Sequence, residues 1–260
     1  MSTTMTAHQN PAGDVRALVS AEEWQVRQDL ACLYRLVAHH GWDDMLFTHL
    51  SARVPGPKHH FLLNPVGLLF DEVTASSLVK VDVEGNKVLD TPYQINPAGF
   101  TIHSAVHMAR DDAHCVMHLH TDDGVAVSAQ EDGLLPITQH AMQVGEVAYH
   151  DYEGVALDLD ERERLVRDLG DRQFMILRNH GTLTVGRTCA DAFMAMYYLE
   201  RACTMQVRAL AGGVAISRPP QGSAEKAATQ SRVLFDGTVG PLAWQALTRR
   251  MERIDPSFRN

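Results

Sequence analysis

The chain has 260 residues, of which 45% are hydrophobic and 21% are charged. This composition fits one globular domain with a large core, and it excludes an intrinsically disordered chain. The formal net charge is −9 and no strong basic run occurs, which argues against nucleic acid as a partner. The sequence has no apolar run of about 18 residues that would predict a membrane span, and its first residues lack a signal-peptide core. We therefore expect a cytoplasmic protein with reduced cysteines and no membrane partner.

The first half of the chain predicts one long helix followed by short strands. Residues 1–19 predict a flexible arm, and residues 20–260 a single domain that ends in helices. Ser20 and Glu23 have the spacing of a capping box, in which each residue caps the other, and Gly41 ends the helix that they begin. Alternating residues predict strands over 45–54 and 61–64, and a hairpin over 78–89.

The second half alternates helices with strands. Helical periodicity marks residues 98–110, 160–169 and 188–210, and two further helices are expected near 224–234 and 241–254. Buried strands are predicted over residues 115–121 and 174–177. This order predicts a three-layer α/β/α sandwich around a mixed or antiparallel sheet. The sequence lacks the glycine motifs of dinucleotide and nucleotide phosphate sites.

Three histidines lie at the ends of the two buried strands. Side chains two apart on a strand share a face, so His118 and His120 leave the first strand side by side. His180 follows the second strand and precedes Gly181. Three neutral imidazoles suit Zn²⁺ or another divalent metal and leave a coordination position open. Periodicity alone does not show that the two strands are neighbours.

Five motifs together resemble the class II aldolase and adducin family, in order and spacing. They are Asn64–Leu68, Gly99–Ala105, His118–Thr121, Gly145–Tyr152 and Leu177–Gly181. The resemblance extends from about residue 19 to about residue 213 and is closer to the adducin head than to the sugar-phosphate aldolases. It implies an α/β/α domain that assembles as a homotetramer, with active sites between subunits. It also implies that His118, His120 and His180 hold Zn²⁺, which polarises a carbonyl during C–C cleavage.

The chain departs from the aldolase pattern at the positions of the acid and the phosphate site. Gly99 stands where the aldolases carry an acidic catalytic residue, and a glycine cannot transfer a proton. Thr48–His49 and Pro97–Ala98 replace pairs that bind phosphate in those enzymes. A phosphorylated substrate is therefore not expected. If only the acid is missing, Gly99→Glu would raise retro-aldol activity.

Other residues are weaker candidates for the site. Ser51 and Gly67 are retained from the phosphate site of the aldolases, so they are candidates for contact with the substrate. Glu146 and His150 could line the pocket. His140 falls near the position of a proton-donating tyrosine, and its usual pKa suits acid–base work. The alternative for His140 is an exposed or interface residue. His103 lies one helical turn after Gly99, on the same face of the helix. It is either an additional ligand or partner of the metal site, or a helix residue packed at the edge of the sheet.

Three functions remain open from the sequence. The first is a zinc-dependent lyase that cleaves, decarboxylates or dehydrates a small hydroxy- or oxo-carbonyl compound. The second is a non-catalytic adducin-like binding or scaffold protein, and the third is a sugar epimerase. The complete set of three histidines favours the lyase, because burying unpaired imidazoles is costly. The missing acid at Gly99 favours the scaffold.

Overall fold

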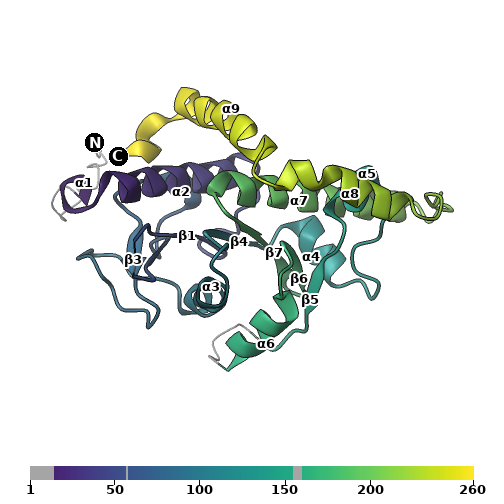
Figure 1. Cartoon of the computed structure of the whole chain (residues 1–260), viewed down its shortest axis with the longest axis horizontal. Coiled ribbons are helices and arrows are strands. Elements are labelled where there is room, and N and C mark those ends of the chain that lie inside the picture. Colours follow the sequence, from purple (N-terminus) through teal and green to yellow (C-terminus); the bar gives the residue numbers. More distant parts are fainter. Residues whose placement is uncertain (1–14, 57, 155–159) are drawn as a thin grey trace, which may run out of the picture.

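The computed structural model describes residues 15–56, 58–154 and 160–260, and within them seven strands form one sheet (Figure 1). The strand order is β3-β2-β1-β4-β7-β6-β5. Neighbouring strands are antiparallel except for β5 and β6, which are parallel. The strands are β1 (His49–Arg53), β2 (Phe61–Leu63), β3 (Val79–Val81), β4 (Cys115–Leu119), β5 (Ala148–His150), β6 (Phe174–Leu177) and β7 (Gly181–Gly186).

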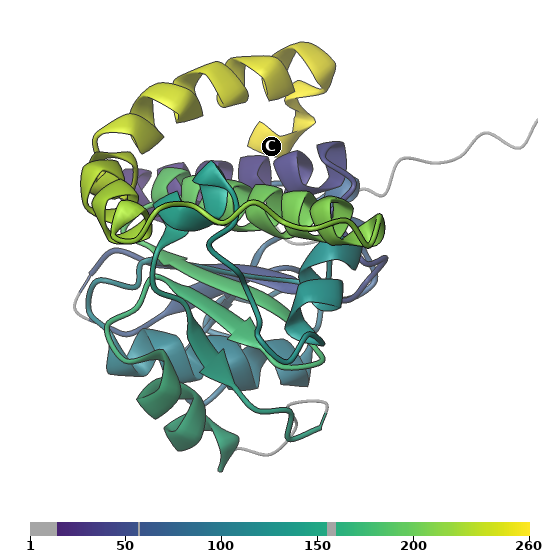
Figure 2. The ribbon, with the colours of Figure 1, turned by 90° about the vertical axis from the view of Figure 1, so that its right-hand side faces the viewer.

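Helices cover both faces of this sheet (Figures 1 and 2). On one face lie α2 (Ala21–His39) and α7 (Cys189–Ala211), with α8 (Ser223–Phe235) and α9 (Val239–Ile254) outside them. The other face is covered by α3 (Pro97–Ala109) and α6 (Glu161–Leu169). The shorter elements are α1 (Val15–Leu18), α4 (Asp122–Ser128), α5 (Gln139–Val144) and the 3₁₀ turns η1 (Phe70–Glu72) and η2 (Pro256–Arg259). The predicted α/β/α sandwich with a mixed sheet is confirmed.

Strand β4 shows how the sequence pattern positions the site. Cys115, Met117 and Leu119 pack into the core under α2 and α7. Val116 points the opposite way, into the core under α3 and α6. Because side chains alternate along a strand, His118 takes the α3 side of the sheet. The apolar pattern of one short strand thus fixes which face carries the first histidine.

The start of helix α2 differs from the prediction in two respects. Ser20 does cap the helix, accepting a hydrogen bond from the Glu23 backbone. The Glu23 carboxylate does not complete the capping box; it accepts hydrogen bonds from Arg27 at 3.0 Å and Lys80 at 2.6 Å, because this end of α2 is packed against the domain. Residues 1–14 of the predicted arm lie outside the described residues. Residues 15–18 form α1 rather than irregular chain, and Val15 is buried beside Trp24.

Two predicted strands are shorter in the structure. Residues 45–48 precede β1 as a turn, in which Met45 and Thr48 have φ of 52° and 66° and an isolated bridge joins Asp44 to Phe47. Left-handed backbone cannot continue a strand, so β1 begins only at His49. The predicted hairpin over 78–89 reduces to β3 and one bridge between Val81 and Lys87.

Helix α9 and the turn after it pack back onto α2, whereas α8 packs against α5 and α7. Trp244 in α9 donates a hydrogen bond to Asp29 at 3.3 Å, and Arg35 pairs with Asp255 at 2.8 Å. The four cysteines are buried and free. No helix in the described ranges is both long enough and apolar enough to cross a bilayer.

Candidate metal centre

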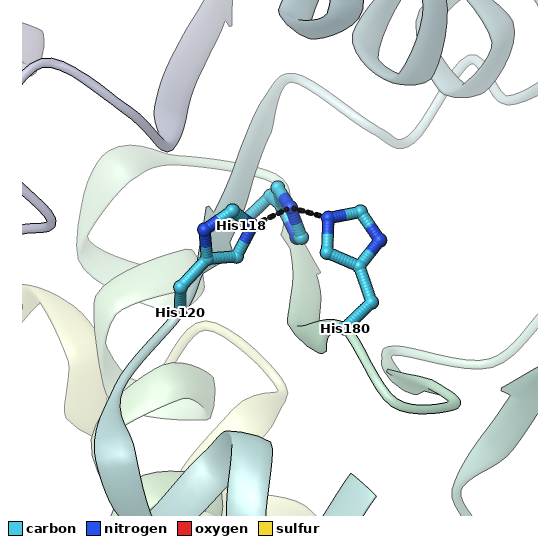
Figure 3. A group of neighbouring side chains, drawn as sticks. All are labelled: His118, His120 and His180. Atoms are coloured by element: carbon cyan, nitrogen blue, oxygen red, sulfur yellow. Dashed lines mark hydrogen bonds between the residues drawn. The ribbon is translucent and has the colours of Figure 1, made fainter. Parts of the chain in front are cut away.

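The pairing of β4 with β7 brings the three strand-end histidines together (Figure 3). His118 lies in β4, His120 directly follows it, and His180 occupies the turn between β6 and β7. Gly181 makes this approach possible, because a Cβ there would lie 2.4 Å from the Leu119 carbonyl oxygen. Asn179 takes a left-handed backbone, with φ of 55°, in the same turn. The two predicted strands, β4 and β6, are not direct neighbours, because β7 lies between them; the turn from β6 into β7 places His180 beside the end of β4.

The three imidazoles point their Nε2 atoms at one another. His118 Nε2 lies 3.0 Å from His120 Nε2 and 3.3 Å from His180 Nε2. Ligand nitrogens about 2.0–2.1 Å from a tetrahedral zinc are separated by about 3.3 Å. The observed separations match this spacing, so the three residues fit a divalent metal.

The hydrogen bonds of the opposite ring nitrogens strengthen this fit. His118 Nδ1 lies 3.0 Å from the Thr182 carbonyl oxygen, and His120 Nδ1 lies 3.1 Å from Asp44 Oδ2. A carbonyl or a carboxylate can only accept, so both Nδ1 atoms carry the hydrogen. When the rings are neutral, the two Nε2 atoms that face each other therefore both carry a lone pair and no hydrogen. Such a contact is repulsive without a shared cation, and a carbonyl or carboxylate that accepts from the other ring nitrogen is the partner that typically orients a metal-bound histidine.

Burial keeps His118 and His180 uncharged. The His118 ring has no solvent exposure, and burial followed by the neighbouring imidazoles holds its pKa well below the usual range. The same causes lower the pKa of His180 to about 4. Neutral imidazole is the form that binds a metal, so burial prepares both residues as ligands at neutral pH.

A buried carboxyl group supports the cluster from below. Glu200 in α7 is 2% exposed and accepts hydrogen bonds from the hydroxyl groups of Thr121 and Thr182. Thr121 follows His120, and Thr182 supplies the carbonyl that orients His118. Burial raises the pKa of Glu200 to about 7. Glu200 therefore ties the backbone on both sides of the histidines to helix α7.

A cavity of about 690 Å³ opens beside the three histidines. Polar groups and a few apolar side chains line it: Asp44, Phe47, Thr48, His49, Asn96, Ala98, Ile102, His118, His120, Asp122, Val125, Tyr152, Gly154, Asn179 and His180. No Lys or Arg is among these lining residues, within the part of the chain that the structure describes. The cavity thus offers imidazole, amide and carboxylate groups rather than cations.

The space beside Gly99 is occupied by a further histidine. A Cβ at Gly99 would lie 2.6 Å from Cδ2 and 2.8 Å from Cγ of His49. The His49 ring is 4% exposed, and its centroid lies 5.1 Å from that of His118. The expectation that Gly99→Glu alone would supply the missing acid needs correction, because its side chain would collide with this imidazole.

Several predicted site residues lie behind the cavity or away from it. His103 and Ser51 are fully buried and do not line it; they are hydrogen-bonded to each other, and His103 also bonds His49. The expectation that Ser51 contacts substrate is corrected on this ground. Gly67 occupies an exposed turn with φ of 99°.

The remaining candidates belong to other surroundings. His140 in α5 stacks on Tyr198, with ring centroids 5.2 Å apart, and is not part of the cavity lining in this chain. Glu146 is 80% exposed and pairs with Arg172 at 3.1 Å. His150 is buried and bonds Asp168 at 2.8 Å. The predictions that Glu146 and His150 line the cavity are wrong, because Glu146 lies on the surface before β5 and the His150 side chain, at the end of β5, faces Asp168 of α6.

Sequence reasoning missed several residues that line the cavity, among them His49, Asp44 and Tyr152. The alternation predicts His49 on the correct strand, but no local pattern shows that it lies beside His118. Asp44 reaches His120 only through the left-handed turn before β1, and that turn contains no glycine to signal it. Tyr152 lies with its ring centroid 6.2 Å from that of His180.

Comparison with known proteins agrees with the fold. The model of the class II aldolase and adducin N-terminal domain matches residues 28–207. A solved aldolase II superfamily protein from Pseudomonas syringae is 52% identical, with a TM-score of 0.91, covering 95% of this chain and 100% of that one. An L-fuculose 1-phosphate aldolase from Glaciozyma antarctica is 27% identical, with a TM-score of 0.79 and the same coverage.

Rattus norvegicus alpha-adducin is similar over nearly the same span. It is 40% identical over 256 residues, which are 94% of this chain and 35% of the adducin. The family model alone covers well over half of the chain. The chain therefore belongs to the class II aldolase and adducin family.

Proposed function

We propose that this protein is a divalent-metal-dependent lyase that acts on a small hydroxy- or oxo-carbonyl compound by C–C cleavage, decarboxylation or dehydration. The observation that carries the proposal is the convergence of the Nε2 atoms of His118, His120 and His180, at separations of 3.0 and 3.3 Å. The three imidazoles would hold the ion, and their ligand type favours zinc. A metal bound there would supply a Lewis acid that polarises a carbonyl oxygen.

The residues around the histidines would orient them for this task. Asp44 fixes the ring of His120, and the Thr182 carbonyl fixes that of His118. Asn96 and Asn179 offer neutral hydrogen-bonding groups to a bound molecule. The lining lacks Lys and Arg among the described residues, which supports a substrate without a phosphate group. The space of about 690 Å³ is ample for a compound of a few carbon atoms.

We also propose a homotetramer in which a second subunit completes the cavity. Exposed apolar side chains gather at its edge: Met45 is 69% exposed, Phe47 59% and Tyr152 54%. Phe47 and Tyr152 themselves line the cavity. Burial of these groups by another copy would remove apolar surface from water. Light scattering of the purified protein tests this, and a monomer with full activity would contradict it.

A second candidate function is a non-catalytic, adducin-like binding protein. It is favoured by the 40% identity with alpha-adducin across 94% of this chain. It is favoured also by the absence of an acid at Gly99, where His49 fills the space. The retention of three convergent imidazoles with oriented Nδ1 groups weighs against it, because packing alone does not require that geometry.

A substrate screen distinguishes the two candidates. Zinc-loaded protein is incubated with short-chain hydroxy-carbonyl compounds and oxo-acids, with and without a phosphate group, and the products are identified by proton NMR. The lyase proposal predicts turnover of a non-phosphorylated compound, abolished in His118→Ala and retained in His140→Ala. Zinc-loaded protein that turns over no compound of this class would favour the binding protein.

A further inference from the structure

A buried line of hydrogen bonds extends from the cavity to the far end of helix α3. It begins at His49 in β1, whose Nδ1 lies 2.8 Å from His103 Nε2. His103 Nδ1 contacts Ser51 Oγ at 2.5 Å, and Ser51 Oγ contacts His107 Nε2 at 2.7 Å. The line ends where His107 Nδ1 lies 2.8 Å from the Ala113 carbonyl oxygen. All four side chains are at most 4% exposed.

The terminal carbonyl sets the direction of every bond in this line. The Ala113 oxygen can only accept, so His107 Nδ1 carries the hydrogen. Burial lowers the pKa of His107 to about 3, so the ring is neutral and its Nε2 is an acceptor. The single hydroxyl hydrogen of Ser51 therefore points to His107. The Ser51 oxygen is then left to accept a hydrogen bond.

The direction carries through the remaining two histidines. His103 must donate from Nδ1 to Ser51, so the Nε2 of its neutral ring accepts from His49. His49 consequently carries its hydrogen on Nδ1, and its Nε2 is a lone pair. No hydrogen-bond partner for His49 Nε2 occurs among the described residues, and His49 is one of the residues that line the cavity. The cavity thus contains a hydrogen-bond acceptor, His49 Nε2. The tautomer of His49 is fixed by the bonds that run through His103 and Ser51 to His107.

We propose that His49 Nε2 is a fixed hydrogen-bond acceptor that selects ligands carrying a hydroxyl hydrogen, and that Ser51, His103 and His107 are positioning residues that hold it in this tautomer. The inference rests on the proposed function and narrows it, from hydroxy- or oxo-carbonyl compounds to those with a hydroxyl group. A ligand with a carbonyl in the same place would set two acceptors against each other. An analogue without the hydroxyl would remove His49 Nε2 from water without giving it a hydrogen-bond donor, which costs binding free energy.

Gly99 makes this position of the His49 ring possible. It lies in the first turn of α3, and the absence of a side chain leaves room for the His49 ring, whose Nε2 would lie 3.2 Å from a Cβ there. A larger residue at this position would push the ring off its bond to His103. The glycine therefore permits the histidine to stand where it can present its lone pair.

A pair of matched ligands tests the selectivity. Glycolohydroxamate and acetohydroxamate share a metal-chelating group and differ by one hydroxyl, and their Kd values for the zinc-loaded protein are measured by calorimetry. We expect glycolohydroxamate to bind about tenfold more tightly, the value of one hydrogen bond to a buried acceptor. His49→Phe and Ser51→Ala should bring the ratio of the two Kd values close to one. Ser104→Ala, a matched change at a buried serine outside the line, should leave the ratio unchanged.

Neutron diffraction from the deuterated wild-type protein at pD 8 tests the tautomer itself. We expect deuterium on Nδ1 and none on Nε2 of His49. Deuterium on Nε2, or equal Kd values for the two hydroxamates in the wild type, would overturn the inference. Failure of both hydroxamates to bind would instead count against the proposed metal function, and the neutron map would still decide the tautomer. A merely structural role for Ser51 would weaken both ligands equally and leave their ratio at the wild-type value.

Discussion

Replacing Gly99 by alanine should destabilise the protein through a single collision. The new Cβ would lie 2.6 Å from His49 Cδ2 and 2.8 Å from Cγ, closer than two such carbons can approach. The ring cannot move freely, because it is 4% exposed and bonded to His103 at 2.8 Å. Such overpacking costs about 1–3 kcal/mol. Alanine returns up to about 1 kcal/mol of helix propensity, so from the middle of the overpacking range we expect a net loss of about 1–2 kcal/mol in the free energy of unfolding.

Urea denaturation at one protein concentration measures this loss as a lower midpoint at an unchanged slope. Gly212→Ala is the matched control, because a Cβ there would meet nothing within 4 Å and its effect should stay within about 0.5 kcal/mol. The double variant His49→Ala/Gly99→Ala removes the collision partner, so the cost of the alanine at position 99 should largely disappear. An alanine at Gly99 that is harmless in the wild type, or equally harmful without His49, would refute this reasoning.

Two further changes test the support of the site. Burial raises the pKa of Glu200 to about 7 from 4.5, so the folded state binds this proton more tightly than the unfolded state; the free energy of unfolding should fall by about 3 kcal/mol as the pH rises from about 4.5 to about 7, and remain lower above it. In Glu200→Gln this part of the pH dependence should vanish, which urea midpoints measured across that range would show, and an unchanged dependence would contradict it. Asp44→Asn weakens the acceptor that orients His120, so it should raise the Kd for zinc by about 10–100-fold. A competition titration with a chelating dye measures this change. Asp71→Asn, outside the cavity lining, is the control and should leave the Kd unchanged.

The framework of this fold follows from local patterns, and the site follows only in part. The apolar run over residues 115–121 identifies β4, and helical spacing identifies α2, α3 and α7 to within a few residues. His118 and His120 share a face for the same reason. The proximity of His180 depends on the β4–β7 pairing, which no local pattern encodes.

The surroundings of the histidines depend on long-range contacts. His49 meets His118 through the β1–β4 register, and it meets Gly99 because α3 crosses the same end of the sheet. Asp44 reaches His120 through left-handed backbone at Met45 and Thr48, residue types that rarely adopt it. Family likeness suggested Ser51 as a substrate contact. Its actual partners, His103 and His107, become visible only when the strand and helix are packed together.

Metal content is the measurement that tests the central claim most directly. The purified protein is loaded with zinc, dialysed and analysed by inductively coupled plasma mass spectrometry, beside His118→Ala and His140→Ala, a matched histidine control outside the cavity lining. We predict one divalent ion per chain in the wild type and in His140→Ala, and none in His118→Ala, with all three proteins showing the same circular dichroism. Folded wild-type protein that retains no metal after loading, or His118→Ala that retains it fully, would contradict the account.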